Sequence, residues 1–269
     1  MINKFDYFIV CLHHHILYVI KQIPTDSKGS NDCLTECLCI ISLCIIKNSF
    51  CFNLININFH MFYLKLIYRI CVYDLYFQGS FASLDIAFAF DSSDNVQLET
   101  FNRMKEFSTK IVNSFRVSSK NARFASLTFS SQAAVDFTFD QYENTAEINQ
   151  AIGRIGHQRR PANLKAAFEL LKSDVFSLHG GIRTSRPKVL VLFYNGNVAL
   201  EEAELRSMVS PLVDYGVRIV VVGMVNGGNV QVDMKQLNLI AQSSSTVFVG
   251  TFDELKREIY LIGSEISRG

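Results

Sequence analysis

Short apolar runs alternate with amphipathic stretches from residue 84 to residue 266 of this 269-residue chain. Two of the runs, 188–194 and 218–224, are dominated by valine, leucine and isoleucine. Strands of this composition are covered on both faces, which is typical of a parallel sheet between two layers of helices. The stretches between the runs place apolar residues three and four positions apart, as amphipathic helices do. The alternation therefore restricts this part of the chain to an α/β fold.

The order of these elements predicts the topology of the sheet. We expect strands at 84–90, 124–129, 133–139, 188–194, 218–224 and 246–249, and helices at 96–115, 146–155, 163–175, 200–215, 234–241 and 252–266. The second and third strands are close enough in sequence to form a hairpin. The prediction is a doubly wound, mostly parallel six-stranded sheet with one antiparallel edge strand and helices on both faces. Ligands bind such sheets beyond the C-terminal ends of the strands, so loops 91–95, 157–163 and 195–199 form the candidate site.

The composition of the chain changes near residue 80. All seven cysteines precede residue 72, and alanine is absent from residues 1–80 but common afterwards. Isoleucine, phenylalanine, tyrosine, asparagine and lysine, whose codons are rich in A and T, fill this segment instead. We interpret residues 1–80 as a non-native or disordered segment, such as translated non-coding sequence, and residues 81–269 as the domain. Residues 75–80 also match the core of a tag-removal protease site, so an expression-tag remnant is a further interpretation.

Two functional interpretations of residues 1–80 fit the pattern less well. A membrane-spanning helix needs about 20 apolar residues, whereas the run 37–46 has ten. This run does not end in the small-residue pattern of a signal-peptide cleavage site. The cysteines between residues 33 and 44 have a spacing that zinc tolerates, but no second organised pair follows them. We therefore expect neither membrane contact nor a metal site in this segment.

Charge and motif content exclude several functions for the domain. The formal net charge of the whole chain is +1, so no broad field attracts nucleic acid. The glycine-rich phosphate loops and the G-x-S-x-G nucleophile motif are absent, and residues 81–269 contain no cysteine. Only His157 and His179 could serve as imidazole bases there. We therefore expect a protein-binding domain that is not an enzyme and has no small-molecule substrate.

One loop carries residues that suit a hard cation. Asp91 and Ser93 directly follow the first buried strand, which places a carboxylate and a hydroxyl at the rim of the sheet. Mg²⁺ prefers such oxygen ligands. The same two residues could instead cap the helix that follows, as aspartate and serine commonly do. The sequence leaves both interpretations open.

The order of these motifs resembles the von Willebrand factor type A family. The D-x-S-x-S hallmark corresponds to Asp91–Asn95, the metal loop to Pro161–Ala167, and the T-D-G motif to Tyr194–Gly196. Residues 123–155 are most similar in pattern to the A-type domains of collagen VI. The resemblance spans about 83–266 and implies an extracellular adhesion or assembly module. It also implies a metal-ion-dependent adhesion site at the rim of the sheet.

The sequence departs from the pattern of that metal site at three of five positions. Asp91 and Ser93 match, and they are our candidate metal residues. Asn95 replaces a serine, Pro161 replaces a threonine, and Asn195 replaces an aspartate. An amide oxygen still coordinates, but it attracts Mg²⁺ far less than a carboxylate does.

Positive charge in the same loop opposes cation binding further. Arg159 and Arg160 directly precede the position of the missing threonine. Two like charges about 4 Å apart repel by about 4 kcal/mol at an effective dielectric of 20. We therefore expect a degenerate site, no required cofactor, and weak Mg²⁺ binding if any.

The resulting functional hypothesis is a secreted extracellular matrix module that binds proteins without a metal. The expected partners are matrix or cell-surface proteins, with collagen chains among the candidates, and neither nucleic acid nor a small-molecule substrate. One alternative is an adhesion receptor domain that depends on Mg²⁺ or Mn²⁺ held by Asn95 and Asn195. Another is an intracellular scaffold domain, because the lack of cysteine in 81–269 suits either compartment.

Overall fold

The computed structural model describes residues 82–196, 198–225 and 232–268. Our expectations for residues 1–80 therefore lie outside the described residues. Six strands form a single sheet in the order β3-β2-β1-β4-β5-β6. They are β1 (Asp85–Asp91), β2 (Arg123–Phe129), β3 (Ala133–Phe137), β4 (Lys188–Phe193), β5 (Val217–Met224) and β6 (Val247–Gly250). All neighbouring pairs are parallel except β2 and β3, which form an antiparallel hairpin, so the predicted fold class is confirmed.

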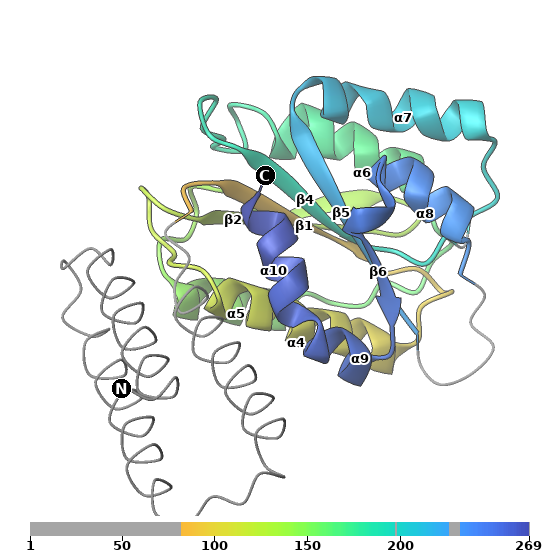
Figure 1. Cartoon of the computed structure of the whole chain (residues 1–269), viewed down its shortest axis with the longest axis horizontal. Helices are drawn as coiled ribbons and strands as arrows, with labels where there is room; N and C mark the ends of the chain where they lie inside the picture. The colour runs from red at the N-terminus through yellow and green to blue at the C-terminus, as the bar shows by residue number, and fades with distance from the viewer. Residues whose placement is uncertain (1–81, 197, 226–231, 269) are drawn as a thin grey trace, which may run out of the picture. The chain divides into compact units, whose positions relative to one another are not determined.

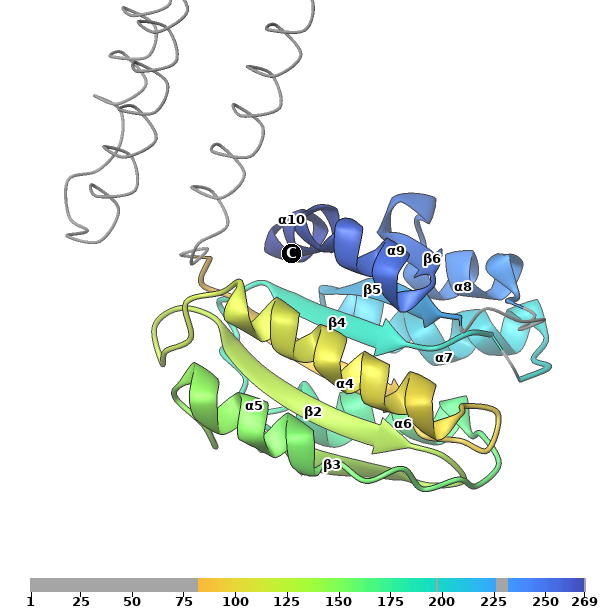
Figure 2. The same cartoon turned by 90° about the horizontal axis from the view of Figure 1, so that it is seen from below.

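Helices cover both faces of the sheet (Figures 1 and 2). On one face lie α4 (Leu98–Asn113), α5 (Thr145–Arg154), α9 (Phe252–Arg257) and α10 (Ile259–Ser267). On the other lie α6 (Leu164–Leu170), α7 (Glu202–Asp214) and α8 (Met234–Ala241). A π-helical turn, η1 (Leu171–Val175), follows α6, and a 3₁₀ turn, η2 (Ser244–Thr246), precedes β6. None of the described helices is both long and apolar enough to cross a bilayer.

The central strand separates two cores of different composition. Ile86, Phe88 and Phe90 of β1 belong to the core beneath α4, whereas Ala87 and Ala89 belong to the core beneath α6. This alternation follows from the two-residue period of a strand. All five side chains are fully buried, as expected for a strand covered on both faces.

Side-chain caps set the beginnings of several helices. Asn144, Asn163 and Asp233 each accept a hydrogen bond from the backbone N–H three residues later, at the start of α5, α6 and α8. Thr251 and Glu254 form a reciprocal capping box at the start of α9. The loop that precedes α6 therefore ends at a defined point, which matters for the candidate site.

Two predicted helices contain irregularities that the sequence does not predict. The stretch 252–266 was expected as one helix, but Glu258 has non-helical dihedral angles and divides it into α9 and α10. The break lets α9 pack against β6 while α10 packs against β5 and α4. The stretch 163–175 is helical, but its last turn is a π-helix. No glycine or proline marks either irregularity in the sequence.

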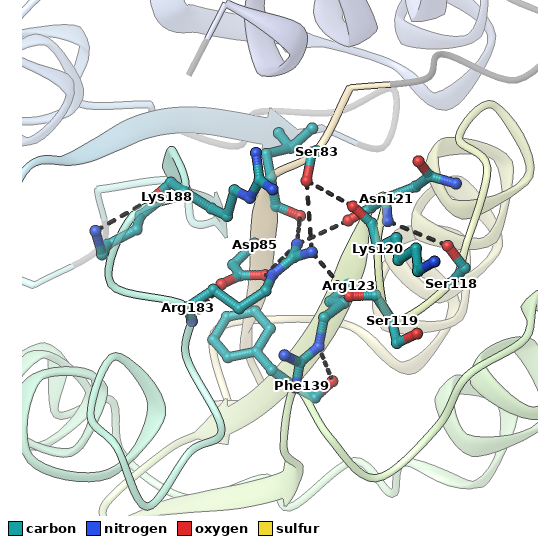
Figure 3. Close-up of polar contacts among 12 residues, drawn as sticks. Ser83, Asp85, Ser118, Ser119, Lys120, Asn121, Arg123, Phe139, Arg183 and Lys188 are labelled. Atoms are coloured by element: carbon teal, nitrogen blue, oxygen red, sulfur yellow. Dashed lines mark hydrogen bonds and ion pairs between the residues drawn. The ribbon is translucent and has the colours of Figure 1, made fainter.

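A buried ion pair fixes the end of the sheet where β1 begins (Figure 3). The side chain of Asp85 is fully buried, and its Oδ1 accepts hydrogen bonds from Nη2 (2.6 Å) and Nε (2.9 Å) of Arg183. The backbone N–H of Arg183 donates to the second oxygen, Oδ2, at 2.8 Å. The guanidinium also donates to the backbone carbonyls of Leu84, Ser119 and Asn121. Arg183 thereby joins the segment before β4 to β1 and to the loop before β2.

Candidate functional site at the C-terminal edge of the sheet

The loop between α5 and α6 is hydrogen-bonded to the loop after β1. The backbone N–H of Arg159 donates to the carbonyl of Ser92 at 2.9 Å, and the N–H of Gln158 donates to Oγ of Ser92 at 2.6 Å. The N–H of Asp94 donates to the carbonyl of Arg160 at 3.0 Å. The structure thus brings together two of the three loops that the sequence selected. Our sequence reasoning did not single out Ser92, since its role depends on contacts across about 66 residues.

A histidine stacked on α4 also contacts the loop after β1. His157 Nε2 lies 3.1 Å from the carbonyl oxygen of Ser93, and its ring stacks on Phe101 with centroids 4.9 Å apart. Lys105 lies over the other ring of this pair, 5.5 Å from the Phe101 centroid, and donates to the carbonyl of Ile155. These contacts assign His157 a structural role at the rim. His179, the second histidine of the domain, is exposed in the segment before β4, at the opposite edge.

The third loop follows β4, the strand beside β1. Phe90 pairs with Phe193 in the sheet, so Asn195 lies one position beyond the level of Asp91. Asn195 is 5% exposed, and its Nδ2 donates to the carbonyl of Met224 at 3.0 Å. This places the amide at the same edge of the sheet as the loop after β1.

Three buried oxygens in these loops have no hydrogen-bond partner among the described residues. They are Oδ2 of Asp91, Oγ of Ser93 and Oδ1 of Asn195. The other oxygen of Asp91 accepts the backbone N–H of Ser93 at 2.9 Å. Buried polar groups are nearly always paired in native proteins, so these three oxygens are candidates for contact with a ligand. Three further buried side-chain atoms elsewhere among the described residues also lack a partner.

The alternative interpretation of Asp91 and Ser93 as helix caps is wrong. Gln97 occupies the N-cap position of α4, and no side chain makes a capping hydrogen bond there. The carboxylate of Asp91 is used instead within its own loop. The helix also begins at Leu98, two residues after the predicted start at Val96.

Burial at the rim changes the pKa of the Asp91 carboxyl group. Burial raises the pKa of Asp91 from its ordinary value of 3.8 to about 6, and this outweighs the opposing effects of the nearby side chain and backbone N–H of Ser93. Burial also raises the pKa of the neighbouring Tyr194 well above its ordinary value, and the charge of Asp91 contributes in the same direction. The tyrosine hydroxyl donates to Oε1 of Gln236 at 2.8 Å. Among the described residues, no cationic side chain offsets the desolvation of the Asp91 carboxylate.

The residues present do not fit a high-affinity site for a divalent cation. Asp91, Ser93 and Asn195 supply three oxygens, but only one of them comes from a carboxylate. Pro161 is exposed and brings no side-chain oxygen, and Asn95 is exposed as well. The described residues contain no group of three or more histidine, cysteine, aspartate or glutamate side chains that could hold a metal.

Sequence comparison places these features in a family. The family profile of the von Willebrand factor type A domain matches residues 85–260. Chicken matrilin-1 is 29% identical over 148 residues, which is 55% of this chain and 29% of that protein. The von Willebrand factor A domain-containing protein 2 of Xenopus laevis is 31% identical over 164 residues, which is 61% of this chain and 20% of that protein. The chain thus matches less than a third of the length of either relative.

Comparison with solved structures supports the same family assignment. Proximal thread matrix protein 1 from the mussel byssus, solved with a zinc-occupied metal-ion-dependent adhesion site, superposes with a TM-score of 0.61 and 25% identity. The superposition covers 71% of this chain and 47% of the mussel protein. Domains of this fold can therefore hold a metal at such a site, which makes the departures at Asn95, Pro161 and Asn195 informative.

Proposed function

The chain belongs to the von Willebrand factor type A domain family, and from this premise we propose that it is a non-enzymatic, protein-binding module of the extracellular matrix. Its rim site, a remnant formed by Asp91 and Ser93, binds a divalent cation weakly or not at all. Its relatives include matrilins and a thread matrix protein, which supports a secreted protein with matrix or cell-surface partners. Collagen chains remain among the candidate partners on the pattern of residues 123–155.

The observation that carries this proposal is the charge of the rim. Hard cations are held mainly by carboxylates, and the rim offers one buried carboxylate with a pKa raised by burial to about 6. At the position of a second carboxylate, Asn195 presents a neutral amide oxygen. Arg159 and Arg160 add exposed positive charge to the adjacent loop. The balance of these charges disfavours a bound Mg²⁺ and leaves protein contacts as the mode of action.

A solid-phase binding array tests the proposal. The full chain is applied to purified matrix proteins, including fibrillar and network collagens, once with EDTA and once with Mg²⁺. We expect saturable binding to at least one matrix protein, with the same affinity in both conditions. Binding that disappears with EDTA would contradict metal independence, and absence of binding to every protein in the array would contradict the matrix function.

A second candidate function is metal-dependent adhesion. The specific observation that favours it is the set of three unpartnered buried oxygens, which are the atoms a cation would need. In that case Asp91→Ala abolishes ligand binding while the domain stays folded, and Mg²⁺ raises the affinity. Under our proposal the same variant retains binding in EDTA, so the array distinguishes the two functions.

A further inference from the structure

Two neighbouring arginines at the rim carry positive charge that the described part of the chain does not neutralise. Arg159 and Arg160 are exposed, and neither forms an ion pair with another described residue. The guanidinium of Arg159 donates to Nδ1 of His157 at 3.4 Å, which is long for a hydrogen bond. By contrast, Arg183, Arg206 and Arg218 all pair with acids in the structure.

The backbone that carries these arginines is held in place on both sides. Its hydrogen bonds to the loop after β1 hold residues 158–160, and the N–H of Asn163 donates to the carbonyl of Ser130 at 2.8 Å. Arg159 has a φ of +54°, a left-handed conformation that costs a residue other than glycine about 1–2 kcal/mol. Such a conformation persists only where the surroundings impose it. The backbone positions of both arginines are therefore fixed, with the guanidinium of Arg159 directed at His157 and Arg160 lining a hollow.

A hollow opens beside one of them. Its volume is about 320 Å³, and it is lined by Ser131, Gln132, Gln158 and Arg160. Each of these four side chains can donate an O–H or N–H hydrogen bond, and the only formal charge among them is that of Arg160. A concave surface with several donors and one cation suits a single anionic group.

We propose that this hollow binds the carboxylate of a single acidic side chain of a partner protein through Arg160, without a metal ion. A guanidinium binds a carboxylate through two parallel hydrogen bonds, which gives both strength and a defined orientation. The inference rests on the proposed function and specifies the chemistry of the partner. It also explains how a rim without a tightly bound cation can still attract acids.

A carboxylate on a protein fits this surface better than a sulfated polysaccharide does. A polyanion needs a row of cations along its length, whereas the arginine pair is flanked by Asp94, which is exposed and bonded through its N–H to the carbonyl of Arg160. The negative charge of Asp94 repels a second anionic group placed next to the first. We therefore expect this surface to prefer one isolated acidic side chain to a polyanion.

An NMR titration of the full chain in EDTA tests this inference. The probes are N-acetyl-glutamate amide and its neutral isostere N-acetyl-glutamine amide, and the signals are the side-chain Nε–Hε resonances of arginine. We expect the glutamate probe to give a saturable shift at Arg160, and the glutamine probe to give none. Arg160→Gln weakens glutamate binding at least about tenfold, since a charged hydrogen-bonded pair is lost. Arg154→Gln, the same change at an exposed position at the end of α5, leaves it unchanged.

Three results would overturn the inference. These are equal shifts with the glutamine probe, unchanged affinity in Arg160→Gln, and tighter binding of a sulfated heparin disaccharide than of the glutamate probe. The matrix array separates this inference from the proposed function. Matrix binding that Arg160→Gln leaves intact overturns the carboxylate site but not the matrix function. Absence of all matrix binding overturns the matrix function, while the titration still decides on the site.

Discussion

Strand β1 carries a buried aspartate at each end, and the two ends of the sheet satisfy them differently. Both oxygens of Asp85 accept hydrogen bonds from Arg183, whose guanidinium also donates to three backbone carbonyls (Figure 3). Asp91 receives one hydrogen bond from the backbone of Ser93, and its second oxygen has no partner among the described residues. Both side chains belong to residues that are 0% exposed.

The contrast distinguishes a buried charge that is compensated within the fold from one that is not. A buried carboxylate is costly unless it is paired and hydrogen-bonded. At Asp85 that cost is offset locally, so the pair joins three segments of the chain at one point. At Asp91 the cost remains, which raises its pKa to about 6. Since ligands of parallel sheets bind at the C-terminal edge, we propose that this uncompensated charge belongs to the remnant of a ligand site.

The largest expected effect on stability follows from removing the arginine that pairs with Asp85. Arg183→Ala leaves the Asp85 carboxylate buried without a partner, so we expect the free energy of unfolding to fall by about 3–5 kcal/mol. Arg183→Lys should recover only part of this loss, because an ammonium cannot reproduce the fork of a guanidinium. Urea unfolding of the full chain measures both. The exposed Arg186 provides the control, and a loss in Arg186→Ala equal to that in Arg183→Ala would remove the special role of the pair.

Removing the uncompensated charge of Asp91 should raise the free energy of unfolding, whereas the loss of Arg183 lowers it. The pKa of Asp91 is raised to about 6 in the folded state, so the folded state holds the proton more tightly than the unfolded state does. The stability associated with this proton is present below about pH 4 and is lost as the pH rises to about 6. Asp91→Asn does not titrate, and we expect it to raise the free energy of unfolding at pH 7 by about 2–3 kcal/mol. Urea unfolding between pH 4 and pH 7 tests this, and a destabilised variant at pH 7 would show that Asp91 is compensated after all.

Adding a second carboxylate beside Asp91 should increase the difference in stability between the two ends of the sheet. Asn195→Asp places another carboxylate at the edge beside Asp91, and we expect a loss of about 1–2 kcal/mol in EDTA from repulsion and desolvation. Millimolar Mg²⁺ should restore this loss, since the variant regains an acid for the cation. Thermal unfolding with and without Mg²⁺ measures the effect. Asn102→Asp, the same change on the exposed surface of α4, should respond to neither condition, and an equal response there would argue against a specific site.

The smallest effect concerns backbone strain at the rim. Glycine adopts the left-handed conformation of Arg159 without steric cost, so Arg159→Gly should stabilise the domain by up to about 1 kcal/mol. Arg154→Gly at the end of α5 should destabilise it by about the same amount, because glycine weakens a helix. Denaturation midpoints compare the two directly, and changes of equal sign would show that the strain at Arg159 is not real.

Much of the fold could be predicted from the sequence because its periods are local. The continuous apolar runs and the helical spacing between them specified the strands, the helices and the antiparallel hairpin. The break at Glu258 could not be predicted, since Leu255, Ile262 and Ile266 keep a regular helical spacing across it and all face the core. The break arises from how α9 and α10 pack against different strands, which is information that local sequence does not contain.

The candidate site was less accessible to sequence reasoning. The motif order located Asp91, Ser93 and Asn195, because each follows a recognisable strand. The stacking of His157 on Phe101 and the hydrogen bonds of Ser92 were not predicted, since they join residues that are far apart in the chain. The left-handed conformation of Arg159 was not predicted either, because arginine gives no local signal for it.

Calorimetric titration of the full chain with Mg²⁺, and separately with Mn²⁺, tests the central claim that the rim has lost its tight cation site. We predict no saturable heat at micromolar cation and, at most, weak binding in the millimolar range. The Asp91→Asn variant should be indistinguishable from the unmodified chain at micromolar cation. A one-to-one isotherm with micromolar affinity that disappears in Asp91→Asn would contradict the account.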